Sequence, residues 1–154
     1  MGHSGRNGLS RYSAERVAVH SAQIRVSTEG DGDIIDITRG VQEVVETAGM
    51  EDGLVNVFVA HSTAAISLIE CETGGLADLR DLMERLVPTD SDYHHNRTAG
   101  DTNAHAHLRA AVIGPSESVP LKGGRLQTGA WQQFVLVDFD DQPRNRTVMV
   151  QVVG

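Results

Sequence analysis

Histidine is concentrated in one polar stretch of this sequence. Residues 93–113 read YHHNRTAGDTNAHAHLRAAVI and hold four of the seven histidines, namely His94, His95, His105 and His107. Histidine titrates near neutral pH and is the commonest transition-metal ligand. A polar stretch that contains glycine is a poor source of core side chains. These residues therefore predict a site for proton transfer or metal binding rather than packing.

Geometry reduces the candidates to one histidine from each of three elements. His94 and His95 are neighbours, and in an extended chain their side chains point in opposite directions. His105 and His107 are two residues apart, which on a helix separates their side chains by about 200°. His107 lies deeper in an expected helix, and His61 ends an expected strand. We therefore predict that His61, His95 and His107 share one site.

Three histidines with an open fourth position are typical of catalytic zinc and of related divalent-metal sites. No HExxH motif is present, so the pattern favours a divalent ion (zinc, magnesium or manganese) without requiring one. A metal-free site stays open, in which the same histidines transfer protons or donate hydrogen bonds to phosphate. Glu70 follows a short apolar segment and is a candidate fourth ligand or general base.

Alternating and periodic apolar residues predict the elements that hold these side chains. Strands are expected over residues 16–26, 54–60, 66–69, 118–121, 132–139 and 147–153, and helices over 39–48, 75–86 and 104–113. Thr73 and Asn103 are expected to cap the second and third helix. The turn at 140–143 is expected to join the last two strands as an antiparallel hairpin.

This pattern predicts an α+β fold, a compact single domain of mostly antiparallel sheet with two or three helices. A length of 154 residues fits one domain with one core. Residues 1–13 are rich in glycine, serine and asparagine and predict a flexible N-terminal segment, with the domain over 14–154.

Composition narrows the function. The net charge of −8 argues against a nucleic-acid partner, and the isolated basic spots suit a small anionic ligand. No apolar run approaches the roughly 20 residues that span a bilayer, and the first residues lack the apolar segment of a secretory signal. We therefore expect a cytoplasmic protein with no membrane partner. Cys71 is the only cysteine, which excludes an intrachain disulfide and a multi-cysteine zinc site.

An ordered set of short segments resembles the YjbQ family of small bacterial and archaeal proteins. The matching segments include HSTAA at 61–65 with Glu70, His95-Asn96, NAHAHL at 103–108, GRL at 124–126, AWQ at 130–132 and PRNR at 143–146. No single segment is specific, whereas their order from about residue 14 to the C-terminus is. Ile69 stands where members often have an asparagine, so any role of that amide is missing here or supplied by another residue.

The resemblance implies a YjbQ-like α+β domain that assembles as a homotrimer, with the activity of a thiamine-phosphate synthase, which some members show. It carries His61, His95 and His107 over as the site. That transferase reaction joins a hydroxymethylpyrimidine diphosphate to a thiazole phosphate and expels pyrophosphate, so it needs cations at the leaving group. A trimer also predicts sites at subunit boundaries, where histidines and anion-binding residues from different chains meet.

Seven residues are candidates for binding a phosphorylated small molecule. They are Asn103, Lys122, Arg125, Gly129, Trp131, Gln132 and Arg144. The cationic side chains suit phosphate, and glycine lets backbone N–H groups approach it closely. Trp131 either walls a heteroaromatic ring or packs in the core or a trimer interface. Two further functions stay open: a metal-dependent hydrolase at the same site, and a non-catalytic trimeric module that binds a metal or small ligand.

Overall fold

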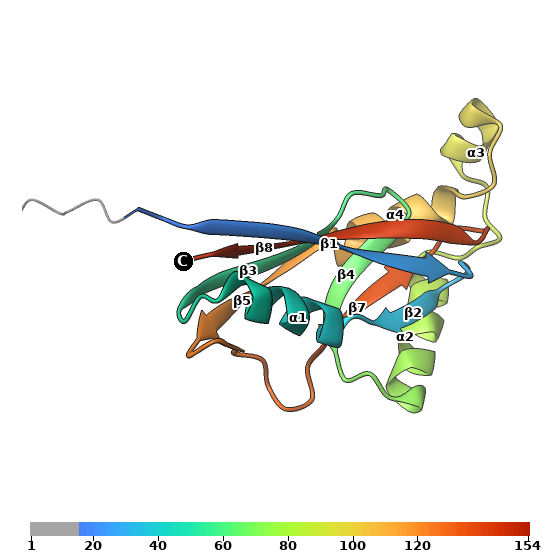
Figure 1. Ribbon diagram of the computed structural model, residues 1–154. Helices are drawn as coiled ribbons and strands as arrows, with labels where there is room; N and C mark the ends of the chain where they lie inside the picture. Colours follow the sequence, from blue (N-terminus) through green and yellow to red (C-terminus); the bar gives the residue numbers. More distant parts are fainter. Residues whose placement is uncertain (1–15) are drawn as a thin grey trace, which may run out of the picture.

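The computed structural model describes residues 16–154, and the predicted flexible segment 1–13 lies outside them. Within the described residues the chain forms eight strands and four helices (Figure 1). They are β1 (Val19–Thr28), β2 (Asp33–Asp36), α1 (Thr38–Ala48), β3 (Gly53–Val59), β4 (Ala64–Ile69), α2 (Thr73–Leu86), α3 (His94–Ala99), α4 (Ala104–Ile113), β5 (Ser116–Lys122), β6 (Arg125–Leu126), β7 (Gln133–Asp138) and β8 (Arg144–Val153). The predicted α+β class is confirmed, and α3 is a helix that the sequence pattern did not indicate.

Two antiparallel sheets carry the fold. The five-stranded sheet has the order β1-β8-β3-β5-β6, and the three-stranded sheet has the order β2-β7-β4. β1 and β8 pair along all ten residues, with Val19 opposite Val153 and Thr28 opposite Arg144. Because β7 and β8 lie in different sheets, the predicted hairpin of the last two strands is wrong. The turn between them instead carries the chain from one sheet to the other.

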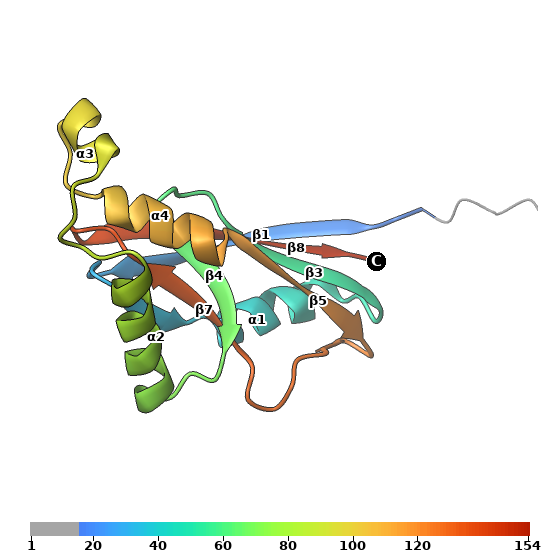
Figure 2. The same ribbon diagram turned by 180° about the vertical axis from the view of Figure 1, so that it is seen from behind.

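The three-stranded sheet is the middle layer of the fold. The five-stranded sheet and α1 cover one of its faces, and α2 and α4 cover the other (Figures 1 and 2). On β7, Phe134 and Leu136 pack on the side of the five-stranded sheet and α1, whereas Val135 and Val137 pack on the side of α2 and α4. A strand buried on both faces has a continuous apolar run. β8 instead alternates between buried and exposed residues, because one face of its sheet is open to solvent.

The helix starts differ in detail from the predicted caps. Glu72, not Thr73, caps α2, and its carboxylate accepts hydrogen bonds from the backbone N–H groups of Gly74 and Gly75. These bonds stabilise the ionised carboxylate and lower the pKa of Glu72. Asn103 is the capping residue of α4 as predicted, but its side chain makes no capping bond. Within residues 16–154, no helix is long and apolar enough to cross a membrane.

Three connections cross between the two sheets at one corner of the molecule. They join β1 to β2, β3 to β4, and β7 to β8, over residues 29–32, 60–63 and 139–143. Backbone hydrogen bonds tie them together: the Asp31 N–H donates to the Asp140 carbonyl at 2.6 Å, and the Phe139 N–H donates to the Thr63 carbonyl at 3.0 Å. Segments that are distant in the sequence therefore share one braced corner.

The first of these connections needs its glycines. Gly30, Asp31 and Gly32 all have positive φ, at 80°, 55° and 81°. L side chains rarely adopt this region, and glycine enters it without steric cost. A Cβ at Gly30 would lie 2.6 Å from the carbonyl oxygens of Asp140 and Gln142. The close approach holds the β1–β2 turn against the segment that carries Asp140.

Candidate functional site

A cleft of about 590 Å³ opens at this corner. Its lining comes from the β3–β4 connection (Ala60, His61, Ser62, Thr63), from the residues around the start of α4 (Asp101, Asn103, His107), and from the β7–β8 connection and the start of β8 (Asp140, Arg144, Asn145, Arg146). An adjoining apolar pocket of about 320 Å³ shares His61, Ser62 and His107, and is completed by Ala64, Ala110, Ala111 and Pro115. Two histidines therefore stand on the boundary between a polar and an apolar half.

The structure brings His95 and His107 together. Their ring centroids are 4.8 Å apart, with the rings edge to face at 67°. His107 is half-buried on α4, whereas His95 is exposed on α3, which extends away from the rest of the fold (Figures 1 and 2). The Asn96 side-chain oxygen accepts the N–H of Ala104 at 3.0 Å and so fastens α3 to the start of α4.

The other two histidines of the cluster face elsewhere. His94 begins α3, not an extended segment, and its Nδ1 contacts Nη2 of Arg97 at 2.7 Å. His105 is only 2% exposed, and its Nδ1 is buried without a partner among the described residues. Burial and then the charge of Arg109 lower the pKa of His105. His105 therefore belongs to the protein interior, and the α4 side chain at the cleft is His107.

His61 has a fixed ring orientation. Its Nε2 accepts the backbone N–H of Thr147 at 3.3 Å, so this nitrogen is unprotonated. Burial and then the nearby positive charge of Arg146 lower the pKa of His61, against a smaller opposing effect of Asp138. The ring is therefore neutral at pH 7, and its single proton is on Nδ1.

A buried ion pair beneath the cleft joins the two sheets. Arg146 of β8 is 5% exposed, and Asp138 of β7 is fully buried. The guanidinium donates to both oxygens of Asp138 at 2.6 Å, and to the Thr63 hydroxyl at 2.8 Å. Thr28 of β1 donates to the same carboxylate at 2.5 Å. A bidentate Arg–carboxylate pair fixes both partners in one geometry.

Asp140 extends this network to the cleft surface. One of its oxygens accepts from the Thr63 hydroxyl at 3.0 Å and from Nε of Arg144 at 2.9 Å. Burial alone would raise the pKa of Asp140, but hydrogen bonds from Arg144, Asp141 and Thr63 overcome this and lower it to about 2. The carboxylate therefore stays ionised and holds the base of the half-exposed Arg144 guanidinium.

Sequence reasoning did not assign Thr63, Asp138, Asp140 or Arg146 to the site. A signal was present, because Asp138 and Asp140 are two apart at the end of one strand and Arg144 and Arg146 are two apart at the start of the next. On extended chain this spacing puts each like-charged pair on one side. The signal was overlooked because residues 140–143 were predicted to be an ordinary solvent-exposed hairpin turn.

The structure separates the other predicted residues from the cleft within one chain. Glu70 is exposed beyond the end of β4, whereas His61 precedes its start. Six residues of strand span about 20 Å. Lys122 and Arg125 likewise lie at the far end of β5 from Pro115, which lines the apolar half.

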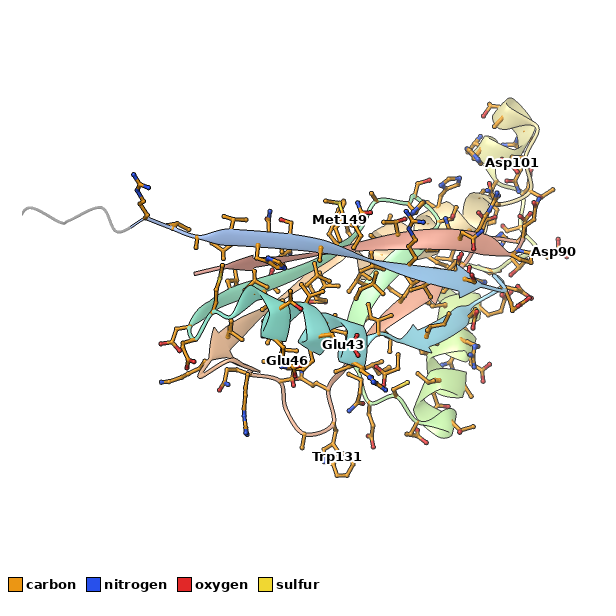
Figure 3. All side chains as sticks on the ribbon, in the orientation of Figure 1. Glu43, Glu46, Asp90, Asp101, Trp131 and Met149 are labelled. Atoms are coloured by element: carbon orange, nitrogen blue, oxygen red, sulfur yellow. The ribbon has the colours of Figure 1, made fainter. Side chains whose placement is uncertain are left out.

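Trp131 and its neighbours lie on the loop before β7. Trp131 is 71% exposed and projects at the opposite end of the view from Asp101 of the cleft (Figure 3). Gln132 does not reach the cleft, because its side-chain oxygen accepts the N–H of Gly129 at 2.8 Å. Trp131 is thus not a core residue of this chain. Any meeting of this loop with the histidines requires another subunit.

The predicted metal ligands do not form a three-histidine set in this chain. Within residues 16–154, no group of three His, Cys, Asp or Glu side chains is placed to hold a metal ion. His95 and His107 are paired, but Nε2 of His61 is engaged by Thr147 and its Nδ1 is protonated. A histidine ligates through an unprotonated nitrogen with an available lone pair. The residues as placed therefore do not fit the predicted site.

Comparison with other proteins gives consistent matches along the described part of the chain. The sequence model of a family described as "UPF0047 protein YjbQ-like" matches residues 22–154. A UPF0047 protein of Methanothermobacter thermautotrophicus is 40% identical over 136 residues, which cover 88% of this chain and 93% of the relative. A UPF0047 protein of Archaeoglobus fulgidus is 40% identical over 131 residues, covering 85% and 99%.

Solved structures match the fold as well as the sequence. A YbjQ-like protein of unknown function from Sulfolobus solfataricus superposes with a TM-score of 0.86 at 35% identity, covering 90% of this chain and 99% of that one. A hypothetical protein from Aeropyrum pernix superposes with a TM-score of 0.82 at 36% identity, covering 88% and 98%.

Proposed function

The chain belongs to the YjbQ (UPF0047) family, and from the chemistry of its cleft we propose that it is an enzyme acting on a small phosphorylated molecule. One observation carries the proposal. His107, whose ring contacts that of His95, lines the same cleft as the guanidinium of Arg144. An imidazole ring can both accept and donate a proton, and a planar guanidinium suits phosphate oxygens.

The division of the cleft supports a heteroaromatic phosphate as the substrate class. The apolar half is lined by alanine and proline side chains and suits an uncharged ring, whereas the polar half holds Arg144 and Asn103. Ligand sites commonly combine apolar walls with a few placed polar groups. His107, which stands at the boundary, and its neighbour His95 would face the bond between the ring system and its phosphate.

Thiamine-phosphate synthesis is the specific reaction that we propose for this cleft. The thiazole nitrogen forms a bond to the methylene carbon of the pyrimidine, and the bond from that carbon to the diphosphate oxygen breaks. The leaving oxygen keeps the electron pair, so pyrophosphate departs with additional negative charge. Arg144 stabilises this charge, and a protonated His107 or His95 donates a hydrogen bond to the departing oxygen. Closely spaced donors of this kind lower the barrier most when they are held in place before the reaction.

The proposal includes a homotrimer, in which a neighbouring subunit would supply the predicted site residues that lie far from the cleft of their own chain. Glu70, Arg125 and Trp131 are far from the histidines of their own chain, so they belong to the site only if a neighbouring subunit supplies them. Light scattering on the purified protein measures the subunit number. A forced monomer that keeps full activity would contradict a site shared between subunits.

The activity test compares wild type with His95→Ala and His107→Ala, supplied with the pyrimidine diphosphate and thiazole phosphate. We expect pyrophosphate and thiamine phosphate from wild type, and at least a 100-fold loss in both variants, the lower end of the usual contribution of general acid–base catalysis (about 10²–10⁴-fold). His94→Ala is the matched control, because His94 is the neighbouring exposed histidine and contacts Arg97 instead of His107. Full activity in either test variant, or equal loss in the control, contradicts the proposal.

Two alternatives give different results in the same samples. A metal-dependent hydrolase would release phosphate from either substrate alone and would contain near-stoichiometric zinc, magnesium or manganese that both test variants lose. A non-catalytic module would show ligand-dependent thermal stabilisation without product, because a ligand bound only by the folded state stabilises that state. Elemental analysis and melting curves on the same preparations separate the three functions.

A further inference from the structure

The buried acidic groups of the cleft floor, Asp138 and Asp140, already have their hydrogen-bond donors, whereas Asp101 is exposed at the rim. Asp138 accepts from both nitrogens of the Arg146 fork and from Thr28. Asp140 accepts from Thr63 and Arg144 through one oxygen, and from the N–H of Asp141 through the other at 2.9 Å. The cleft floor therefore has little acceptor capacity left for a cationic ligand.

By contrast, N–H groups of His61 and Arg144 in the polar half have no hydrogen-bond acceptor in the described part of the chain. Nδ1–H of His61 has no hydrogen-bond partner among residues 16–154, and it is not one of the fully buried unpartnered atoms. Arg144 is engaged through Nε alone, so its two terminal nitrogens have no partner among those residues, and its side chain is 43% exposed. The neutral His61 ring and the outer edge of Arg144 therefore offer N–H groups to the cleft.

Asn103 supplies an independent sign of a missing ligand. The residue lines the cleft, is only 7% exposed, and its side-chain oxygen is buried without a partner in the described part of the chain. Leaving a buried polar atom unpaired is costly, so such an atom usually marks a site that water or a ligand completes. The N–H₂ end of the same amide is not among the buried unpartnered atoms, so it is the end that can donate to an oxygen atom in the cleft.

Hydrogen bonds behind these donors fix the orientation of the His61 ring and of the Arg144 guanidinium. Thr147 orients His61 from β8, and Asp140 orients Arg144 from the β7–β8 connection. Asp140 is in turn fixed by Thr63. A cleft with oriented donors above the engaged carboxylates of Asp138 and Asp140 favours a ligand that consists of acceptor atoms, and a guanidinium edge matches two oxygens of one oxyanion.

We propose that the polar half of the cleft is an oxyanion subsite in which Nδ1–H of His61 and the outer edge of Arg144 bind a phosphate-type group, with the Asn103 amide completing the shell. The inference rests on the proposed function and deepens it, because it names the part of the substrate that each residue holds. It also gives His61 a role as a neutral hydrogen-bond donor, in place of the predicted metal ligand.

Calorimetric titration with inorganic phosphate and pyrophosphate tests the subsite on the full chain. We expect Arg144→Gln and His61→Ala each to weaken pyrophosphate binding by about 10- to 100-fold, the usual effect of losing a charge-assisted hydrogen bond. Arg144→Lys keeps the charge but loses the fork, and we expect intermediate binding. Arg39→Gln removes one positive charge from the exposed surface of α1, where Arg39 is paired with Glu43, and should change binding less than about 2-fold.

Two outcomes of the titrations would contradict the proposed oxyanion subsite. Absence of phosphate and pyrophosphate binding by wild type, or an equal loss in Arg39→Gln and Arg144→Gln, overturns the subsite. Malonate distinguishes the oxyanion: tighter binding of pyrophosphate assigns the site to phosphates, and equal binding assigns it to carboxylates as well. Far-ultraviolet circular dichroism confirms that each variant is folded.

Nitrogen-15 NMR of the His61 imidazole provides a measurement that does not depend on a variant. We expect Nε2 to be the unprotonated nitrogen and the Nδ1 resonance to shift when phosphate is added. A proton on Nε2 in both the free and the phosphate-loaded protein overturns the donor role. Phosphate binding without any turnover would contradict the proposed enzyme and leave the subsite intact, whereas turnover without phosphate binding would contradict the subsite alone.

Discussion

Replacing Arg146 with methionine should strongly destabilise the protein. The guanidinium is 5% exposed, donates to both oxygens of the fully buried Asp138, and lies 3.5 Å from Asp140. Methionine fills a similar space but leaves two buried carboxylates without their central cation. Removing one partner of a buried pair costs about 3–5 kcal/mol, a large part of the roughly 5–15 kcal/mol that stabilises an ordinary domain.

Urea unfolding at one fixed protein concentration measures this loss. Arg25→Met is the matched control, because Arg25 is exposed on β1 of the same sheet, and we expect a change within about 0.5 kcal/mol. The double variant Asp138→Asn with Arg146→Met should recover at least about 1 kcal/mol of the loss, since one unpaired charge is then absent.

The reasoning fails if Arg146→Met costs less than about 1 kcal/mol, which would mean that water or rearrangement compensates the buried carboxylates. It also fails if the double variant is as unstable as the sum of the two single variants. In that case the charge pair between the sheets would not be the cause of the loss.

Three further predictions follow from single positions. The pKa of Asp140 is about 2 in the folded protein against an ordinary 3.8, so its ionised carboxylate stabilises the fold above pH 4, and this stabilisation is lost as the pH falls through 2. Measured by urea unfolding at a series of acidic pH values, Asp140→Asn should lack this pH-dependent stabilisation, which is on the order of 2 kcal/mol. Gly30→Ala should lower the free energy of unfolding in urea by at least about 2 kcal/mol, because the added Cβ clashes with carbonyl oxygens at a residue that also has a positive φ. Gly123→Ala is the control: Gly123 has a positive φ but open space around it, so we expect a loss of about 1 kcal/mol. Equal losses in the two variants would refute the clash. Trp131→Ala should leave the unfolding free energy of the monomer within about 0.5 kcal/mol, since the ring is 71% exposed, and a larger loss measured on monomer would contradict that exposure.

Local patterns predicted most elements but not their exact ends. The apolar run that becomes β7 and the alternation that becomes β8 were both assigned as strands, since burial on two faces or one is visible in the order of side chains. α3 was missed because HHNRTA has no apolar stripe. What holds this helix is a tertiary contact, the bond from the Ala104 N–H to the Asn96 side chain.

The candidate site shows the same division. The histidines were identifiable as a cluster, and His107 was preferred to His105 because it lies deeper in the expected helix. The structure buries His105 and leaves His107 half-buried at the cleft. The distance between Glu70 and His61 was not predictable in the same way. It depends on their lying at opposite ends of β4, whereas the sequence pattern placed His61 at the end of the strand 54–60 and Glu70 after the strand 66–69.

By itself, the sequence determined the α+β class, the family resemblance, the strand and helix periods, and the histidines that merit testing. These depend on local regularities, because alternation and helical spacing report burial whatever the partner element is. Only the tertiary structure decided that β7 and β8 lie in different sheets and that Asp138 meets Arg146 beneath the cleft. Strand partners are chosen by contacts between residues far apart in the chain, and a local hydrophobic period contains no information about which strand pairs with which.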